Sequence, residues 1–142
     1  MIKISEASIN DSEAISNLLE QLDYSDTSRF INKRIKELIE HENETLLVAK
    51  INTKVVAVLS LHFIPQLALE GDFCRISYFC VDEDSRSCGV GALLESYAVK
   101  IAKEKKCDRI EVHCNKRREK AHKFYYKQGY VESPKYLIKS LV

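Results

Sequence analysis

Arg86-Ser87-Cys88-Gly89-Val90-Gly91 is the stretch that decides the fold, because it joins an apolar run at residues 76–81 to an amphipathic run that begins at Ala92. This order predicts a strand, a glycine-containing turn and a helix start. The first backbone N–H groups of a helix have no partner within the helix, and the helix dipole adds partial positive charge there. The junction therefore suits a phosphate group, which Gly89 and Gly91 would let approach closely.

Two motifs carry a resemblance to a known family. Residues 81–94, Val-Asp-Glu-Asp-Ser-Arg-Ser-Cys-Gly-Val-Gly-Ala-Leu-Leu, resemble the signature of the GNAT superfamily of acetyl-CoA-dependent N-acetyltransferases, in which Arg/Gln-x-x-Gly-x-Gly/Ala holds the coenzyme A pyrophosphate. Asn115 and the following residues 117–130 resemble the superfamily's Asn and its Ala-His-x-Phe-Tyr-x-x-x-Gly-Phe/Tyr segment. Residues 19–24 and 46–50 are more weakly similar to the first helix and second strand of small bacterial members.

The resemblance implies a single GNAT-like N-acetyltransferase domain over residues 1–142, with acetyl-CoA as cosubstrate. The acetyl group would pass to a primary amine of a small molecule or peptide by direct attack in a ternary complex. In the superfamily the strand before the turn carries a bulge and splays from its parallel neighbour, which opens a slot for pantetheine. The cofactor-binding residues that this implies are Phe79, Cys80 and Val81, through their backbone, together with Arg86, Ser87, Cys88, Gly89, Val90, Gly91, Asn115 and His122.

Tyr125 aligns with the tyrosine that is often proposed as the general acid of the superfamily. A phenol suits that step, because with a pKa near ~10 it is protonated at neutral pH and can donate to a thiolate. The alternative is a core tyrosine on an apolar helix face. Arg117, His122 and Lys123 could approach the adenosine phosphate or form a solvated helix face.

A general base is where the chain departs from much of the superfamily, since some members place a Glu on the central strand. Here no carboxylate lies between Arg75 and Val81. Other candidates are Glu70, Asp72, His62 and His113, or a water chain serving an amine of lowered pKa. No base is assigned. Cys88 occupies a variable position of the motif, so we favour an incidental residue over an acetyl-cysteine intermediate.

Composition bounds the remaining possibilities. The chain has 22 Lys and Arg against 21 Asp and Glu, and a net charge of +1 argues against a general attraction to nucleic acid or membrane. The five cysteines lack Cys-x-x-Cys spacing, so we expect free thiols and no metal. The absence of a long apolar run or a signal-peptide pattern leads us to expect a cytoplasmic protein.

Periodicity gives the expected elements. Strands are predicted at residues 2–4, 45–50, 54–63, 73–81, 109–114 and 136–141, with Pro65 ending the third and the 73–81 and 109–114 strands parallel. Helices are predicted after an Asp11 N-cap, over residues 28–41, after Gly91, and over 117–128 with Gly129 at C′. The fold class is α/β: a GNAT-like, mostly antiparallel sheet of six to seven strands with a parallel splayed central pair and about four helices.

Two other classes stay open. A non-catalytic acyl-CoA-binding or regulatory domain would keep the cofactor slot without efficient proton transfer. A different mononucleotide-binding α/β protein is disfavoured, because its phosphate loop would normally follow an early strand. Amine choice should depend on residues 23–29, 65–72 and 133–135, which do not identify an acceptor. A homodimer also stays open.

Overall fold

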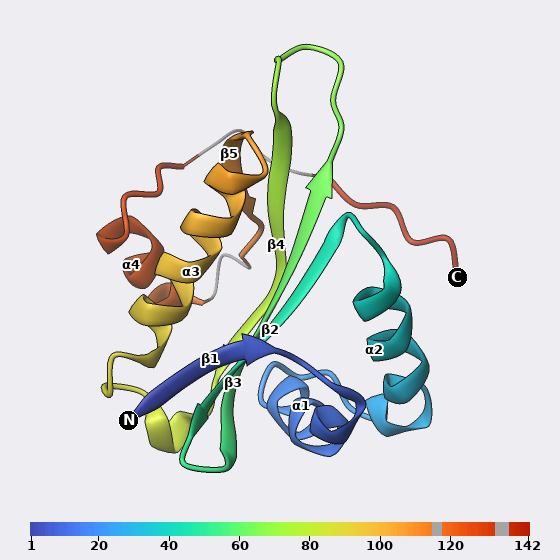
Figure 1. Cartoon of the computed structure of the whole chain (residues 1–142), viewed down its shortest axis with the longest axis vertical. Coiled ribbons are helices and arrows are strands. Elements are labelled where there is room, and N and C mark those ends of the chain that lie inside the picture. Colours follow the sequence, from blue (N-terminus) through green and yellow to red (C-terminus); the bar gives the residue numbers. More distant parts are fainter. Residues whose placement is uncertain (115–117, 133–136) are drawn as a thin grey trace. The chain divides into compact units, whose positions relative to one another are not determined.

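The computed structural model describes residues 1–114, 118–132 and 137–142. In chain order the elements are β1 (Ile2–Glu6), α1 (Ser12–Glu20), α2 (Ile31–Glu40), β2 (Glu44–Ile51), β3 (Lys54–Ile64), β4 (Asp72–Val81), α3 (Val90–Glu104), β5 (Cys107–Val112) and α4 (Glu119–Lys127) (Figure 1). They fall into two compact units, Met1–Glu111 and Val112–Val142. The first unit carries nearly all of the sheet, and the second carries α4.

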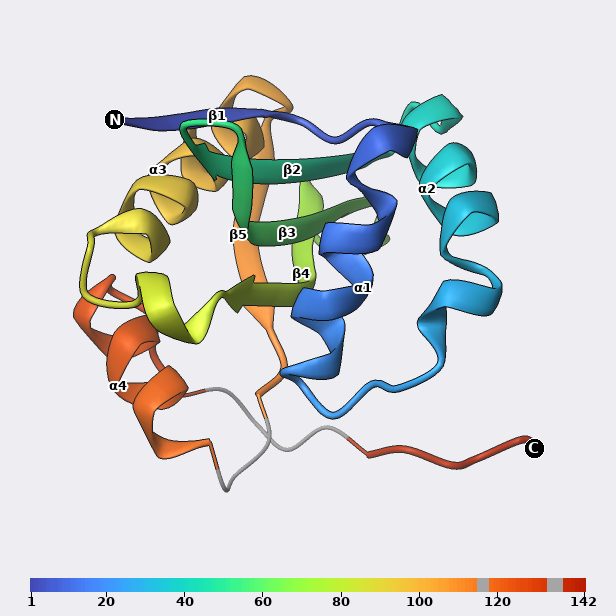
Figure 2. The same cartoon turned by 90° about the horizontal axis from the view of Figure 1, so that it is seen from below.

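The sheet has the strand order β1-β2-β3-β4-β5, and Figure 2 shows the first four strands in this order. The three pairings from β1 to β4 are antiparallel. Contacts between β4 and β5 advance in the same direction: the backbone N–H of Gly71 donates to Asp108 Oδ2 at 2.6 Å, and Arg75 Nη2 donates to Glu111 Oε1 at 2.8 Å. β4 and β5 are therefore parallel, joined by the α3 crossover.

Both faces of the sheet are covered within the first unit. Val48, Val58 and Cys80 lie opposite one another on β2, β3 and β4 and pack in one buried cluster with residues of α1 and α2. Figure 1 shows α3 on the other side of the strands from α1 and α2. Strands buried on both faces read as continuous apolar runs, which is the pattern of β3.

Local sequence signals explain most of the helix and strand boundaries. Asp11 precedes α1 as predicted, but its carboxylate accepts from the Ser8 backbone N–H at 2.9 Å and pairs with Lys50 at 3.2 Å instead of capping α1. The hairpin turn between β2 and β3 uses Asn52 at φ 57°, a conformation that Asn tolerates. β3 ends at Ile64, immediately before Pro65, as the missing proline N–H predicts.

The predicted number of strands is wrong. Five strands form the sheet over the described residues, where we expected six to seven. Residues 137–141 of the expected last strand have no strand structure, and Tyr136 lies outside the described residues. An apolar run is a local signal, whereas a strand also needs a neighbouring edge that accepts its backbone hydrogen bonds. The expected second helix is also shorter, since a 3-10 turn (Thr27–Arg29) precedes α2.

The second unit centres on α4, which ends in a complete Schellman motif. The Tyr130 backbone N–H donates to Tyr125 O and the Gly129 N–H donates to Tyr126 O, both at 3.0 Å. Gly129 has φ 96°, so it occupies the left-handed C′ position predicted for it. Over the described residues, no helix is both long enough and apolar enough to cross a bilayer.

Candidate functional site

The turn after β4 joins a strand to the start of a helix, as the sequence predicts. A 3-10 turn (Glu83–Ser85) leads to Arg86, and α3 begins at Val90 with Gly89 as its N-cap. Ser87 and Gly89 are both left-handed, with φ 80° and 79°. Left-handed residues in such a turn let successive N–H groups face one concave side, beside the N-terminus of a helix.

Hydrogen bonds to Gln21, to β3 and to the end of β4 hold this turn in place. Gln21 Nε2 donates to Asp82 Oδ1 at 2.8 Å, and the Glu83 backbone N–H donates to Gln21 Oε1 at 3.1 Å. The Asp82 backbone N–H also donates to Val56 O at 2.7 Å. Arg86, predicted to lie near the phosphates, donates from Nε to Val81 O at 3.1 Å, which closes the turn onto the end of β4. The turn is therefore preorganised.

The strand that leads into the turn pairs with β3 up to its last residue. Phe79, Cys80 and Val81 pair with Leu59, Val58 and Ala57 of β3 along one edge. Cys80 is buried, and its Sγ lies 3.2 Å from Leu18 O of α1. The side chain of Cys80 therefore belongs to the core, so any cofactor contact here is a backbone contact.

β4 carries a bulge just before these residues. Tyr78 lies opposite Ser60 while Ile76 lies opposite Leu61, so Ser77 is the extra residue. Ser77 and Tyr78 are consecutive exposed residues in a strand that otherwise alternates. A bulge at this point matches the one that the family resemblance implies.

Three hydrogen-bonded polar side chains lie at the bulge. His62 of β3 is directly opposite Glu44 of β2, and its Nδ1 is hydrogen bonded to Glu44 Oε2. His62 Nε2 lies 2.5 Å from Ser77 Oγ. Tyr24, from the connection after α1, contacts the Tyr78 ring edge-on with centroids 5.3 Å apart. We call Glu44, His62 and Ser77 the bulge triad.

The sequence indicates His62 only as one of several candidate bases and does not point to Glu44 or Ser77. Extending the pairing Ile51↔Lys54 regularly from the hairpin turn would place Glu44 opposite Leu61. An irregularity at Ala49/Lys50 shifts the register by one residue, and such a shift exchanges the two faces of a strand. The one available signal was that Glu44 and His62 lie near the far ends of the strands predicted at residues 45–50 and 54–63.

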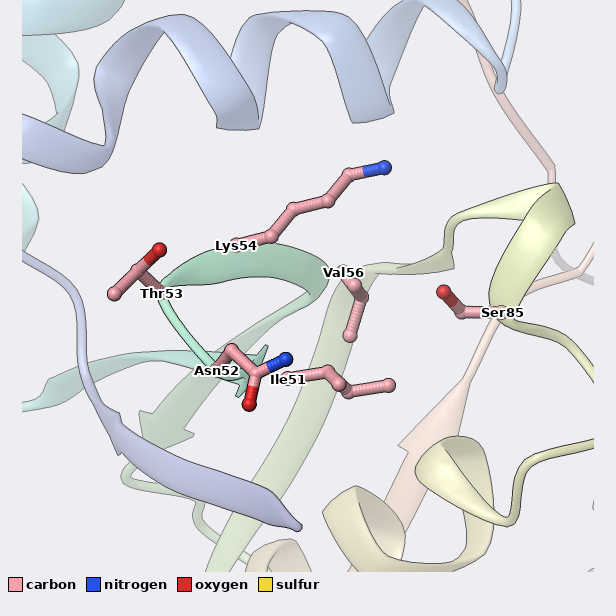
Figure 3. Close-up of a pocket in the computed structure, with 6 residues that line it drawn as sticks. All are labelled: Ile51, Asn52, Thr53, Lys54, Val56 and Ser85. Atoms are coloured by element: carbon pink, nitrogen blue, oxygen red, sulfur yellow. The ribbon is translucent and has the colours of Figure 1, made fainter.

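Two hollows lie next to the β2–β3 hairpin, away from the bulge triad. One of about 380 Å³ is lined by residues including Asn52, Lys54 and Ser85 (Figure 3). The other, of about 450 Å³, adds Asp82 and residues of α1. Neither is lined by Ser77 or by residues 86–91. The candidate site is thus defined by the backbone of the bulge and turn.

The remaining predicted residues belong to the second unit. Tyr125 is buried, with ring centroids 5.4 Å from Phe124 and 5.3 Å from Tyr130. His122 Nε2 lies 3.4 Å from Cys114 O. Asn115 lies outside the described residues. The first unit thus brings residues 79–81 and 86–91 together, and α4 carries Tyr125 and His122 on a separate unit.

The cysteines do not form a reactive or metal-binding cluster in the described part of the chain. All five are free thiols, and over these residues no three His, Cys, Asp or Glu side chains are grouped to hold a metal ion. Burial raises the pKa of the Cys74 thiol to about 12, with a smaller effect from Cys107. Burial also raises the pKa of Cys107 and Cys114. Cys88, in the turn, is exposed.

Comparisons with known proteins agree with this geometry. The family model for the acetyltransferase (GNAT) family matches residues 12–130, so the chain belongs to the GNAT acetyltransferase family. A crystal structure named as a transcriptional regulator from Bacillus halodurans C-125 is similar at 25% identity and a TM-score of 0.90, covering 99% of this chain and 100% of that one.

Two named acetyltransferases share the fold. Glucosamine-6-phosphate N-acetyltransferase from Arabidopsis thaliana is 20% identical, with a TM-score of 0.87 and coverage of 100% and 99% of the two chains. An aminoglycoside acetyltransferase from an uncultured soil metagenomic sample is 20% identical, with a TM-score of 0.85 and coverage of 99% and 97%. Members of this family are generally enzymes that bind acetyl-CoA.

Proposed function

We propose that the chain is a single N-acetyltransferase domain that transfers an acetyl group from acetyl-CoA to a primary amine. The observation that carries this proposal is the β4–α3 turn, where left-handed Ser87 and Gly89 precede the N-terminus of α3. The pyrophosphate of the coenzyme would accept hydrogen bonds from backbone N–H groups across residues 86–91. Arg86 is held beside these groups by its bond to Val81 O.

The bulge supports the second part of the proposal. From Ser77 to Val81 an extended strand rises roughly 13 Å at ~3.3 Å per residue, a span that the pantetheine arm can follow from the turn. The thioester would then lie at the bulge, with pantetheine paired to the backbone of Phe79, Cys80 and Val81. An amine would reach the carbonyl from the face that carries Tyr24 and Tyr78.

Tyr125 is proposed as the general acid that protonates the leaving thiolate. Asn115 and His122 are proposed as further cofactor contacts by their position in the second family motif. The acceptor is a small amine or a peptide amine. The named relatives act on an aminoglycoside and on glucosamine 6-phosphate, and this chain's connection after α1, with Tyr24, is where its own choice would be made.

Initial-velocity kinetics test the proposal. Coenzyme A release would be followed with acetyl-CoA and sisomicin, spermidine, glucosamine 6-phosphate or a lysine-containing peptide as acceptor. Direct attack in a ternary complex predicts intersecting double-reciprocal lines for at least one amine. Parallel lines would contradict direct attack, because they indicate a covalent acetyl-enzyme.

A second candidate is a non-catalytic acyl-CoA-binding or regulatory domain. It is favoured by the absence of a carboxylate in residues 75–81, and one similar structure is named as a transcriptional regulator. Tight acetyl-CoA binding with no turnover of any amine in that panel would favour this candidate over the enzyme.

A further inference from the structure

We propose that His62 is the general base that removes a proton from the acceptor amine, with Glu44 as its positioning residue. The inference rests on the proposed acetyltransferase function. It assigns the step for which residues 75–81 of β4 supply no carboxylate, and it uses two strands that the family motifs do not include.

Geometry identifies the proton acceptor. Glu44 Oε2 is bonded to His62 Nδ1, which fixes the tautomer with the proton on Nδ1 and the lone pair on Nε2. The lone pair faces Ser77 Oγ, 2.5 Å away, so without substrate the hydroxyl donates to it. An ammonium group can replace the hydroxyl there with a stronger, charged donor.

The position of the bulge triad suits an incoming substrate. The His62 side chain is 25% exposed and that of Glu44 19%, so the imidazole is supported on one side and open on the other. Ser77, the bulge residue, marks the place where the thioester is proposed to lie. The amine would therefore be deprotonated next to the carbon that it attacks.

The other candidate bases are less well supported by the structure. Asp72 is at the start of β4, roughly 16 Å from Ser77 at ~3.3 Å per residue, and Glu70 precedes it in an exposed loop. His113 belongs to the second unit. His62 Nε2, by contrast, lies 2.5 Å from the Oγ of the bulge residue Ser77.

The positively charged side chain opposite His62 in the sheet does not oppose proton transfer to its imidazole. Arg75 lies opposite His62 on β4, but its guanidinium is paired with Glu111, which also accepts from Arg109 Nε at 3.1 Å. Glu44 remains to stabilise the imidazolium that forms. Tyr78 follows the bulge residue and contacts Tyr24, and desolvation raises the pKa of Tyr78, which keeps its phenol neutral.

The need for a base follows from the chemistry. A primary amine with a pKa near that of lysine, about 10.4, is neutral in fewer than about one molecule in a thousand at pH 7. In the proposed step the ammonium gives one proton to Nε2, and the amine attacks the carbonyl carbon to form the C–N bond. The C–S bond then breaks. A second proton leaves the nitrogen, and this loss is balanced by the proton that the thiolate takes up. His62 returns its own proton to solvent. The products are the amide, coenzyme A thiol and one proton.

His62→Gln tests the assignment, because it keeps a polar side chain while removing the base. We expect unchanged acetyl-CoA affinity by calorimetry and a fall in kcat/KM at neutral pH of about 10²- to 10⁴-fold with the best acceptor of the amine panel. Activity should return partly with added imidazole, and the ratio to wild type should shrink as pH approaches the pKa of the amine. Glu44→Gln should show a smaller loss of the same kind.

His41→Gln is the matched control, since it makes the same change at an exposed histidine, the C-cap of α2, outside the bulge triad. It should retain wild-type activity. Full activity of His62→Gln at neutral pH, in a protein that binds acetyl-CoA, would overturn the inference and leave the proposed function intact. If Ser77→Ala lost activity and Ser77 of the wild type were found acetylated, Ser77 would instead be a nucleophile, which would also overturn the inference. A wild type that acetylates no amine would overturn the proposed function itself.

Discussion

Individual side chains of α4 divide sharply by environment. Tyr125 is buried against Phe124 and Tyr130, whereas the adjacent Tyr126 is 53% exposed. The family motif assigns the proton donor to the first of these two tyrosines. Adjacent helical residues point about 100° apart, so only one of them can face a given site.

Tyr125→Phe should therefore lower kcat by about 10²- to 10⁴-fold, because the phenol that protonates the thiolate is lost. The ring contacts with Phe124 and Tyr130 are preserved, so acetyl-CoA affinity should not change. Steady-state kinetics and calorimetry on the same preparation measure both quantities. Tyr126→Phe is the control and should keep wild-type kcat; equal rates for the two variants would refute the general-acid role.

Cys74 gives a prediction about stability. It is fully buried, and its pKa rises from 9.0 to about 12. The folded state therefore holds this proton above pH 9, where the unfolded chain releases it. The free energy of unfolding should fall as pH rises from about 9 towards 12, and Cys74 should contribute no pH dependence below that range.

Urea titrations across this range would measure the effect. Cys74→Ala should show a shallower alkaline loss of stability than Cys88→Ala, in which the exposed thiol is removed and the buried one kept. Tyr78, Cys107 and Cys114 have raised pKa values too, so some decline should persist in every variant. Identical slopes in the two variants would show that Cys74 does not hold its proton.

Among the elements, β4 carries a bulge. Ser77 is the inserted residue, and the strand alternates normally on either side of it. Without Ser77, Ile76 and Tyr78 would become neighbours with side chains on opposite faces, which is the regular pattern. The bulge is thus not needed for burial, and its proposed value lies in the backbone that it redirects towards the cofactor.

Deletion of Ser77 separates these roles. The protein should stay folded by circular dichroism and thermal unfolding, while acetyl-CoA affinity should fall at least tenfold because the backbone of residues 79–81 loses its geometry. Ser77→Ala keeps the bulge and should bind normally. Wild-type affinity in the deletion variant would mean that the bulge does not form part of the cofactor site.

At this same scale, the sequence predicts most elements and the parallel arrangement of β4 and β5, but not the register of the strands. Pro65 ends β3 and Gly129 ends α4 because each residue restricts or permits specific backbone angles, and such effects are local. The registers of β2 and β4 depend on bulges that no local sequence pattern predicts. The contacts within the bulge triad could therefore be predicted only in part. The expected last strand is absent over residues 137–141 for a related reason, since an apolar run alone supplies no partner edge.

For the molecule as a whole, the two family motifs lie on different units. The first motif forms the β4–α3 turn of Met1–Glu111, and the second lies in Val112–Val142. The sequence predicted the family and the α/β class correctly, because the glycine turn and the Ala-His-x-Phe-Tyr segment are specific. The acceptor could not be predicted, since the connection after α1 carries no comparable motif.

The central claim is that the β4–α3 turn binds acetyl-CoA, and isothermal titration calorimetry tests it most directly. Gly89 is the variant position, because its φ of 79° disfavours any side chain although a Cβ there would meet no atom within 4 Å. Gly89→Glu adds backbone strain of about 1–2 kcal/mol and a negative charge beside the proposed pyrophosphate. We predict saturable binding of acetyl-CoA to the wild type that is lost in Gly89→Glu with the fold retained. A folded wild type that does not bind acetyl-CoA, or equal affinity in both proteins, would contradict this account.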